Sequence, residues 1–401
     1  MKTEENNTDL RLIDPLRIAL VAERFWPFSG PTELNLGELA TELKRQGHAV
    51  QILTSKLEKS WPGLLDYREI PVNRIARISG GPWATLRYAR RFGKYFCETE
   101  RVDAILVFGF SIVTHAILRS VGQELPVVVF VNRSLLGVDS VQQIPRRYIG
   151  GLSRCRAVVT DCQSLAEDLS QLDDMPPVQV IATGAAAAMQ PPSLSSQSGA
   201  RAALSEAHPI LGVDAGQPLA ITSLTDNNDD GILDAIRAWS TVIENYPKAK
   251  LWIVGDGKLA ARAWQEIVDL NLIQSVVMPG FFDDDAGLLL AADLYIHSYR
   301  THRADPGVIR AMAKQRCILA TANRWTEGFI EPDENGLLAP SANPSALAEA
   351  IQLAFSKSEL RSRLASRGVK TAELQFSLPR QVDLILKLLQ LPADQPCEST
   401  L

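Results

Sequence analysis

Short apolar runs alternate with amphipathic helical patterns along almost the entire chain, and no other feature of the sequence constrains the fold as strongly. Residues 32–46 show the helical pattern, since Leu36, Leu39, Ala40 and Leu43 recur at intervals of three, one and three. Strands that alternate with helices in this way are typical of βαβ units, which build a parallel sheet. The strand-like runs of the first half lie at residues 16–22, 49–54, 104–108, 127–131, 157–160 and 178–181.

A segment rich in Ala, Ser, Pro and Gly, residues 182–216, interrupts this alternation. A second series of apolar runs follows it at 219–224, 251–254, 276–278, 294–296 and 318–321. We therefore predict an α/β protein with two Rossmann-like domains that face an interdomain cleft. The predicted parts are a tail (1–14), an N-terminal domain (15–188), a linker (189–215), a C-terminal domain (216–377), a helix that crosses back to the first domain (378–392) and a second tail (393–401).

Composition excludes several classes of protein. The chain is 46% hydrophobic and 22% charged, which is ordinary for a globular enzyme, and its net charge of −5 gives no reason to expect a nucleic-acid partner. No apolar run is long enough for a transmembrane helix, and residues 1–14 do not resemble a signal peptide. The five cysteines form no CxxC pair and the five histidines are scattered, so we expect buried thiols in a cytoplasmic protein with no metal site and no cofactor.

A basic amphipathic stretch lies at residues 87–96, where Arg87, Arg90, Arg91 and Lys94 alternate with aromatic residues. Such a helix can lie on an anionic membrane, which would make the protein membrane-peripheral. It can equally pack its aromatic side on the sheet and leave a solvated basic face. The sequence leaves both interpretations open.

Several segments resemble the family-4 glycosyltransferases of the GT-B fold. The stretch that begins RIALVAERFWPFSG and ends RQGHAVQILTS is similar to the opening strand, glycine-rich loop and helix of that family. In the second half, IVGDG, AADLYIHS, RAMA and ENGLLAP follow the order and spacing of its members. The resemblance covers residues 16–392, nearly the whole chain.

This resemblance implies a function as well as a fold. It implies retaining transfer of a sugar from a nucleotide-sugar, held by the C-terminal domain, to a glycan or lipid-linked acceptor held by the N-terminal domain. It implies no obligatory metal, because cationic groups and helix N-termini hold the diphosphate in this family.

The expected diphosphate-binding residues depart from the family pattern. The N-terminal loop retains Gly30, but Pro31 replaces its second glycine and has no N–H to donate. The family's arginine position falls on Ser223, and its lysine position falls in the acidic segment 227–231. The histidine expected on the acceptor side corresponds to Asn132, which cannot exchange a proton at neutral pH.

The segment that usually carries Glu-x7-Glu departs as well. Its second glutamate corresponds to Arg310, and its first falls on Thr301 or His302. Asp305, followed by Pro306 and Gly307, has the pattern of an N-cap with proline at the first helical position. A carboxylate there would compete with a donor phosphate for the backbone N–H groups.

Other residues are candidates for a compensating site. Cations near the cleft could form a new anion site, or could belong to a solvated loop neutralised by Asp305 and residues 283–285. Phe281, after Gly280, could stack on a nucleobase or pack at the rim, and Gly255 with Asp256 forms a predicted strand-to-helix turn beside the cleft. The cations are Arg300, His302, Arg303, Arg310 and Arg324.

Three functional hypotheses follow from these residues. The first is an active glycosyltransferase that recognises its donor through the cleft cations. The second is a non-catalytic descendant that binds a glycan, a nucleotide or a partner enzyme. The third is a sugar-nucleotide sensor that binds without turnover.

Overall fold

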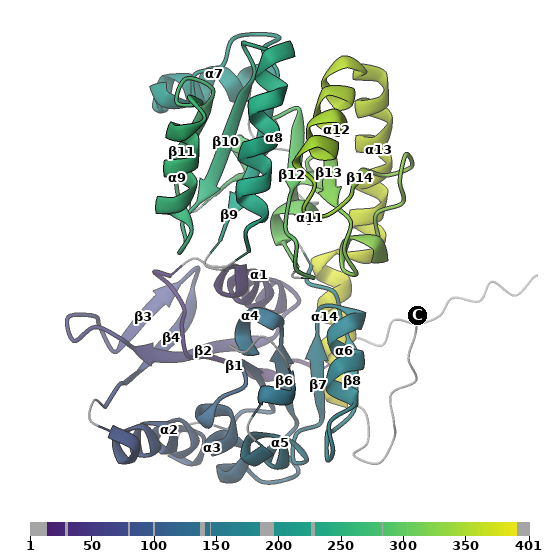
Figure 1. The fold of residues 1–401 in the computed structure, drawn as a ribbon. Coiled ribbons are helices and arrows are strands. Elements are labelled where there is room, and N and C mark those ends of the chain that lie inside the picture. The colour runs from purple at the N-terminus through teal and green to yellow at the C-terminus, as the bar shows by residue number, and fades with distance from the viewer. Residues whose placement is uncertain are drawn as a thin grey trace, which may run out of the picture.

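The computed structural model shows two α/β halves stacked end to end, with the N-terminal half purple to blue and the C-terminal half green to yellow in Figure 1. Each half contains one sheet, so the predicted pair of Rossmann-like domains is confirmed. The structure describes residues 14–28, 31–78, 81–98, 101–136, 141–144, 146–184, 196–225, 229–282, 284–302 and 304–390.

The N-terminal sheet has eight strands in the order β3-β4-β2-β1-β5-β6-β7-β8, and β3 runs antiparallel to β4 while the other pairs are parallel. The strands are β1 (Arg17–Ala22), β2 (Ala49–Lys56), β3 (Leu64–Tyr67), β4 (Ile70–Ala76), β5 (Ala104–Phe108), β6 (Val127–Val131), β7 (Ala157–Thr160) and β8 (Val178–Val180). The helices are α1 (Pro31–Arg45), α2 (Gly81–Glu98), α3 (Ile112–Ser120), α4 (Arg133–Leu136), α5 (Arg146–Leu152) and α6 (Gln163–Ser170), with a 3-10 turn at Val141–Gln143.

Helices cover both faces of this sheet, which explains why its central strands are almost continuously apolar. On one face Leu20 packs in a cluster with Leu36 of α1. On the other face Val107 packs in a cluster with Phe92 of α2 and Ile117 of α3. The predicted helix at 32–46 is α1, one residue earlier at each end.

The C-terminal sheet has six parallel strands in the order β11-β10-β9-β12-β13-β14. The strands are β9 (Leu219–Leu224), β10 (Lys250–Gly255), β11 (Val276–Gly280), β12 (Leu294–His297), β13 (Cys317–Thr321) and β14 (Leu337–Ala339). The helices are α7 (Gln197–Ala207), α8 (Gly231–Asn245), α9 (Ala260–Asp269), α10 (Ala286–Ala291), α11 (Pro306–Ala313), α12 (Pro344–Ser356) and α13 (Ser358–Gln375), with 3-10 turns at Pro209–Leu211 and Thr326–Gly328.

The helix α14 (Leu378–Gln390) crosses from the C-terminal half to the N-terminal half, as predicted (Figure 1). Its Val382 and Ile385 lie in the same apolar cluster as the first strands of the chain. The Gln381 side-chain oxygen accepts hydrogen bonds from the Gly184 N–H at 2.9 Å and from the Asn35 side-chain amide at 3.4 Å. This helix is therefore a structural part of the N-terminal half.

The described cysteines are free thiols, of which Cys97 is exposed and Cys155, Cys162 and Cys317 are buried. Burial raises the pKa of Cys155 and of Cys317 to about 12, so these two thiols are unreactive structural residues. Within the described ranges, no three His, Cys, Asp or Glu side chains gather as a metal-binding group. No helix in the same ranges has the length and apolarity needed to cross a bilayer.

Candidate functional site

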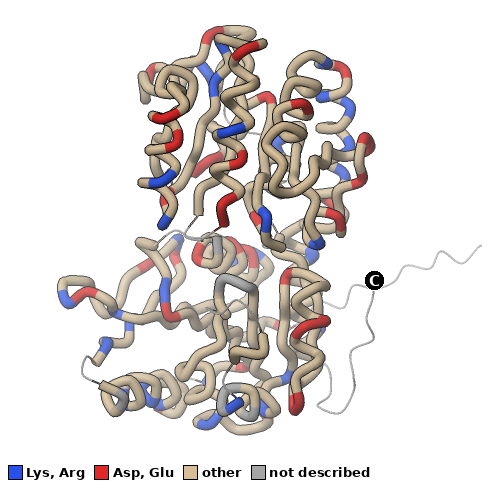
Figure 2. Tube along the Cα trace, viewed as in Figure 1, with Lys and Arg blue, Asp and Glu red and all other residues tan. Residues whose placement is uncertain are grey.

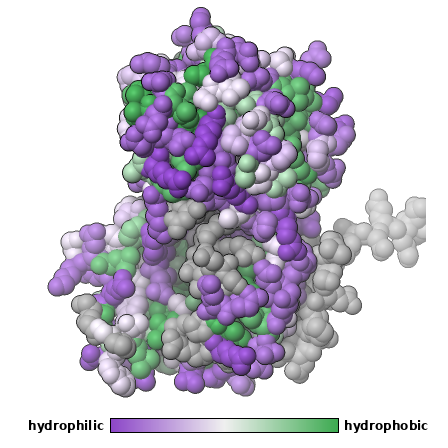
Figure 3. Space-filling view, viewed as in Figure 1, coloured by the Kyte–Doolittle hydropathy of each residue, from purple (hydrophilic) through white to green (hydrophobic). Residues whose placement is uncertain are grey.

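A cavity of about 1280 Å³ lies between the two halves, beyond the carboxyl ends of strands from both sheets. Ala22 and Phe108 contribute from the N-terminal half, and Ser223 and Val254 contribute from the C-terminal half. Hydrophilic residues gather on the C-terminal half where it meets the other half (Figure 3). This is the place where open α/β sheets usually bind ligands.

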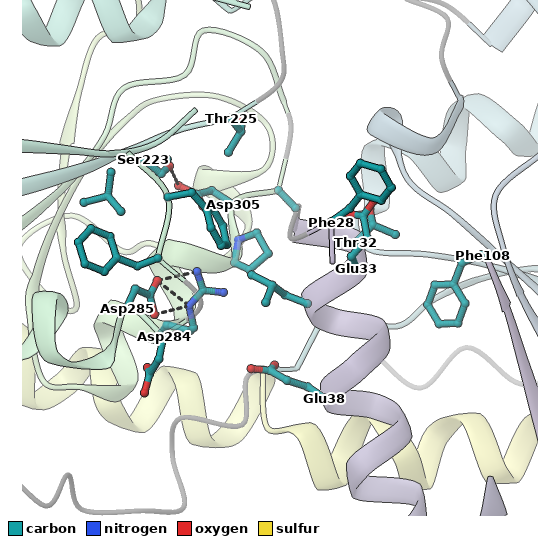
Figure 4. Close-up of a pocket in the computed structure, with 18 of the residues that line it drawn as sticks. Phe28, Thr32, Glu33, Glu38, Phe108, Ser223, Thr225, Asp284, Asp285 and Asp305 are labelled. Carbon is teal, nitrogen blue, oxygen red and sulfur yellow. Dashed lines mark hydrogen bonds and ion pairs between the residues drawn. The ribbon is translucent and has the colours of Figure 1, made fainter. Parts of the chain in front are cut away.

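Asp305 is the centre of the C-terminal wall of this cleft. Its Oδ1 accepts the Gly307 N–H at 2.9 Å and so caps α11, while Ser223 Oγ and Tyr295 OH donate to Oδ2 at 2.9 and 2.8 Å. His297 Nδ1 lies 3.3 Å from the same Oδ2 atom. Figure 4 shows Ser223 joined to Asp305 on one side of the cavity. The predicted N-cap is present and its carboxylate has side-chain partners from two neighbouring strands.

The hydrogen bonds keep Asp305 ionised although it is buried. Burial acts to raise the pKa of Asp305, but hydrogen bonds from His297, Tyr295 and the Gly307 N–H outweigh it and lower the pKa to about 2. Burial and the nearby Asp305 charge raise the pKa of Tyr295 and of Tyr299 above the ordinary tyrosine value. The start of α11 therefore carries the ionised carboxylate of Asp305, and the hydroxyl of Tyr295 that donates to it is neutral.

Arg310 also lies in the cleft wall, where it forms a bidentate ion pair with Asp285. The shortest of these contacts joins Arg310 Nη2 and Asp285 Oδ2 at 2.8 Å. Burial acts to lower the pKa of Arg310, but the charge and hydrogen bonds of Asp285 hold it above its ordinary value. The dashed lines in Figure 4 mark this pair, with Glu38 of α1 on the opposite wall.

The other predicted cations do not gather with Arg310. Arg300 forms a bidentate ion pair with Asp234 at 2.7 Å, and its backbone N–H donates to Asp229. His302 Nδ1 accepts a hydrogen bond from the Arg324 N–H at 3.3 Å. The Arg324 side chain reaches Glu167 of α6 in the other half. These described cations take part in separate interactions, and Arg303 lies outside the described residues.

The turn after β10 is close to the cleft, as its sequence suggested. Gly255 and Asp256 both line the cavity. Gly255 has a φ of +112°, and a Cβ there would lie 2.1 Å from the Leu224 carbonyl oxygen, so glycine is required for this approach between neighbouring strands. Gly280, which ends β11, has a φ of +85° and precedes Phe281, whose side chain is 43% exposed and lines the cleft.

The remaining predicted residues are Asn132, Gly307 and Gly30. The Asn132 side-chain oxygen accepts the Leu135 N–H at 2.8 Å and so caps the short helix α4, and Asn132 lines a separate, smaller hollow. Gly307 is buried against the Tyr295 hydroxyl, which a Cβ at this glycine would approach to 2.1 Å. Gly30 lies outside the described residues.

Sequence reasoning missed most of the N-terminal wall. Glu38 and Glu42 line the cleft from α1, at the i, i+4 spacing of a polar helix face, which could have been recognised in the predicted helix. Tyr67 and Arg68 line it from the β3–β4 hairpin, which the apolar pattern did not reveal.

Comparison with known families identifies the chain. The family described as "Glycosyl transferases group 1" matches residues 217–357, and a "Glycosyl transferase 4-like domain" matches residues 33–184. The chain belongs to the group 1 glycosyltransferases. The two matches correspond to the two halves of the structure, so each half of the chain has its own family match.

Individual relatives agree with this assignment. The chain is 28% identical over 156 residues to the lipopolysaccharide core biosynthesis glycosyltransferase LpsE of Rhizobium meliloti, and the match covers 38% of this chain and 46% of that relative. The chain therefore spans less than half the length of that relative. It is 21% identical over 339 residues to an alpha-monoglucosyldiacylglycerol synthase of Streptococcus pneumoniae, covering 80% of this chain and 75% of the synthase.

Solved structures share the fold. The crystal structure of Anabaena HepE in complex with UDP and glucose superposes with a TM-score of 0.73 at 18% sequence identity, covering 93% of this chain and 99% of HepE. At this identity the likeness concerns the fold, and it confirms the GT-B architecture predicted from the sequence.

Proposed function

We propose that this chain transfers a sugar from a nucleotide-sugar, bound on the C-terminal wall of the cleft, to a glycan or lipid-linked acceptor bound on the N-terminal wall. The observation that carries the proposal is the cavity of about 1280 Å³ lined by both halves. Single-ligand pockets usually measure roughly 300–1,000 Å³, so this cleft has room for a donor beside an acceptor. Retention of the anomeric configuration is part of the proposal, since the family resemblance implies it.

The donor end offers a place for the nucleotide base. Phe281 is partly exposed in the cleft wall, and the Gly255 turn brings bare backbone to the same cavity. An exposed aromatic ring can stack on any base, and removal of such a ring costs about 1–3 kcal/mol of binding per base. The HepE structure, which contains UDP, supports a uridine nucleotide as the first donor to test.

A second candidate function rests on Asp305. Its carboxylate already accepts the α11 N–H and is ionised at neutral pH, and the charges that line the cleft add to its effect. The lining includes eight carboxylate residues against five cationic ones, an unfavourable field for a diphosphate. This candidate is a glycan-, nucleotide- or partner-binding protein without turnover. The lining residues are Glu23, Glu33, Glu38, Glu42, Asp256, Asp284, Asp285 and Asp305 against Arg24, Arg45, Arg68, Arg310 and Lys314.

Thermal unfolding with UDP-, GDP- and ADP-sugars, followed by an assay for released nucleoside diphosphate, separates the two candidates. A ligand at 100 times its dissociation constant stabilises a protein by about 2.7 kcal/mol. Transfer requires a shift with one donor, and nucleotide release that an acceptor accelerates. A shift without release, or no shift with any donor, would favour the second candidate.

A matched pair of variants tests the donor end. Phe281→Ala should weaken donor binding about 10-fold or more, because the stacking surface is lost. Trp264→Ala is the control, since Trp264 is a similarly exposed aromatic residue on α9 that does not line the cleft. Equal binding by both variants would remove Phe281 from the donor site. The anomeric coupling constant in the NMR spectrum of the product tests retention.

The helix α2 supports a membrane contact for a lipid-linked acceptor. Arg87, Arg90, Arg91 and Lys94 are exposed, and Trp83 near the helix start is 78% exposed. In Figures 1 and 2 this helix lies on the side of the N-terminal half away from the C-terminal half. Basic residues near an anionic bilayer contribute about 1 kcal/mol each, and tryptophan favours the interface. Of the two interpretations of this helix, a membrane-binding face and a solvated basic face, we propose the first: the basic face binds anionic lipid.

Co-sedimentation with phosphatidylglycerol and phosphatidylcholine vesicles tests this contact. The intact chain should bind the anionic vesicles alone, and Arg87→Gln/Arg90→Gln should lower that affinity about 10-fold or more, from two lost contacts of about 1 kcal/mol. Arg363→Gln/Lys370→Gln, on exposed positions of α13, is the charge-matched control. Equal loss in both double variants would mean that net charge, and no defined face, governs binding.

A further inference from the structure

The turn between β3 and β4 holds two charged residues in a conformation that favours glycine. Tyr67 pairs with Ile70 across the hairpin, so Arg68 and Glu69 alone form the turn. Their φ angles are +50° and +61°, both left-handed. Two-residue hairpin turns of this kind are usually built from Asn-Gly, because a Cβ is strained at positive φ. The chain therefore keeps two long charged side chains at a place where glycine would be less strained.

The role of Glu69 is visible in the structure. Lys44 of α1 donates one hydrogen bond to the Glu69 carbonyl oxygen at 2.9 Å and another to Glu69 Oε2 at 2.8 Å. These two bonds join the turn to α1, which carries part of the cleft wall. Glu69 thus holds the turn in position through Lys44, whereas the Arg68 side chain contacts the ring of Tyr67.

A fixed aromatic ring supports Arg68. The Tyr67 ring packs edge-on against Phe25, with 5.0 Å between ring centroids. Its hydroxyl lies so close to α1 that a Cβ at Gly37 would come within 2.8 Å of the hydroxyl oxygen. The Arg68 guanidinium carbon lies 5.3 Å from the centre of the Tyr67 ring, within the range of a cation–π contact. The cation is thereby held against a ring that cannot easily move.

Arg68 differs from the other arginines that line the cleft. Arg24, Arg45 and Arg310 each have a carboxylate partner, in Glu33, Glu42 and Asp285 respectively. Among the residues that the structure describes, no carboxylate lies within ion-pair distance of the Arg68 guanidinium. Arg68 therefore lines the cavity without a carboxylate partner among the described residues, whereas the other three arginines are paired within their own wall.

We propose that Arg68 binds an anionic group of the saccharide acceptor, a carboxylate or a phosphate, at the N-terminal end of the cleft. The planar guanidinium donates two parallel hydrogen bonds to either group, and the cavity holds the attached sugar. This inference rests on the proposed function only in that the N-terminal wall receives the saccharide. It names the chemical class of that saccharide, which is acidic.

The test uses the full chain and three probes, glucuronic acid, glucose 6-phosphate and glucose, with binding measured by NMR titration. The intact chain should bind one of the acidic probes at least about 10-fold more tightly than glucose, the effect of one charge-assisted hydrogen bond. The probe that binds more tightly identifies the group as carboxylate or phosphate. Arg68→Gln should bind that probe no better than glucose, and Arg68→Lys should recover part of the preference.

Controls separate this site from general charge and from the transfer reaction. Arg77→Gln removes an exposed arginine just beyond β4 that does not line the cleft, and it should retain the preference. The proposal fails if the intact chain shows no preference for an acidic probe, if Arg68→Gln retains the preference, or if inorganic phosphate binds as tightly as glucose 6-phosphate. The test measures binding and not transfer. If the chain prefers the acidic probe but transfers no sugar, the proposed transfer is wrong and the role of Arg68 still holds.

Discussion

The two walls of the cleft differ in one charge. Arg24 and Arg45 of the N-terminal wall have carboxylate partners in their own half, as Arg310 of the C-terminal wall does, whereas Arg68 does not. On the C-terminal wall, Asp305 receives hydrogen bonds from its own half, and Arg310 is neutralised by Asp285 of the same half. On the N-terminal wall, Arg68 lines the cavity with no described carboxylate within ion-pair distance. Charges satisfied within one wall stabilise that wall and are not available to a ligand. A charge left unsatisfied contributes little to stability and is available for binding.

The difference predicts that substitutions on the C-terminal wall change the stability of the protein more than its binding of an acidic saccharide. Substitutions at Arg68 should change the binding of an acidic saccharide more than the stability. Buried polar networks are costly to disrupt because each group left without a partner keeps its desolvation penalty. An exposed side chain without such partners carries no penalty of this kind.

The largest effect is expected for Asp305→Ala. The substitution removes the carboxylate that accepts from the half-buried Ser223 and the buried Tyr295 hydroxyls, and it uncaps α11, at a combined cost of about 3 kcal/mol in the free energy of unfolding. Urea unfolding measures the change. Asp173→Ala, at an exposed aspartate, should change stability by less than about 0.5 kcal/mol. Similar losses in the two variants would contradict the view that the C-terminal wall is held by Asp305.

The pH dependence of stability should show the next largest effect. The folded-state pKa of Asp305 is about 2, below the ordinary value of 3.8, so its contribution is complete above about pH 5 and is lost as the pH falls. The loss should be about 1 kcal/mol by pH 3 and about 2 kcal/mol by pH 2. Measuring the free energy of unfolding of the intact chain and of Asp305→Asn at pH 5 and pH 3 isolates the contribution of the Asp305 charge. A constant difference between the two proteins would show that Asp305 does not titrate in this range.

A smaller effect of opposite sign is expected for Arg68→Gly. Glycine relieves the left-handed strain at φ +50°, which outweighs the greater freedom of the unfolded chain and should stabilise the protein by about 1 kcal/mol. Arg68→Ala is the control, because it removes the guanidinium but keeps a Cβ in the strained position. Thermal unfolding compares the three proteins. Loss of stability in both variants would mean that the contact with Tyr67 outweighs the strain.

The smallest effect is expected for the ion pair that joins the two halves, Arg324 to Glu167. Its side chains are 53% and 45% exposed, so solvent and salt screen it and its coupling should not exceed about 0.5 kcal/mol. A double-mutant cycle with Arg324→Gln and Glu167→Gln measures this coupling at low and high salt. A larger, salt-independent coupling would mean that the two walls are tied together more firmly than their separate charge networks suggest.

The sheets could be predicted from the sequence because their central strands are buried on both faces and therefore form apolar runs. The β3–β4 hairpin could not, since β3 is short and half-exposed and β4 contains Pro71, Asn73 and Arg74. The Asp305 cap was readable from Asp-Pro-Gly, a local pattern. Its bond to Ser223, 82 residues away, depends on the order of strands in the sheet.

The position of α14 has a consequence for how the protein is made. Its apolar residues complete a cluster whose other members include strands and α1 of the N-terminal half. The ribosome produces this helix after all of the C-terminal half, so the first half synthesised keeps an uncovered apolar face until α14 has been made. The C-terminal half, whose own sheet and covering helices are contiguous in the chain, is therefore the one that can finish folding first on the ribosome.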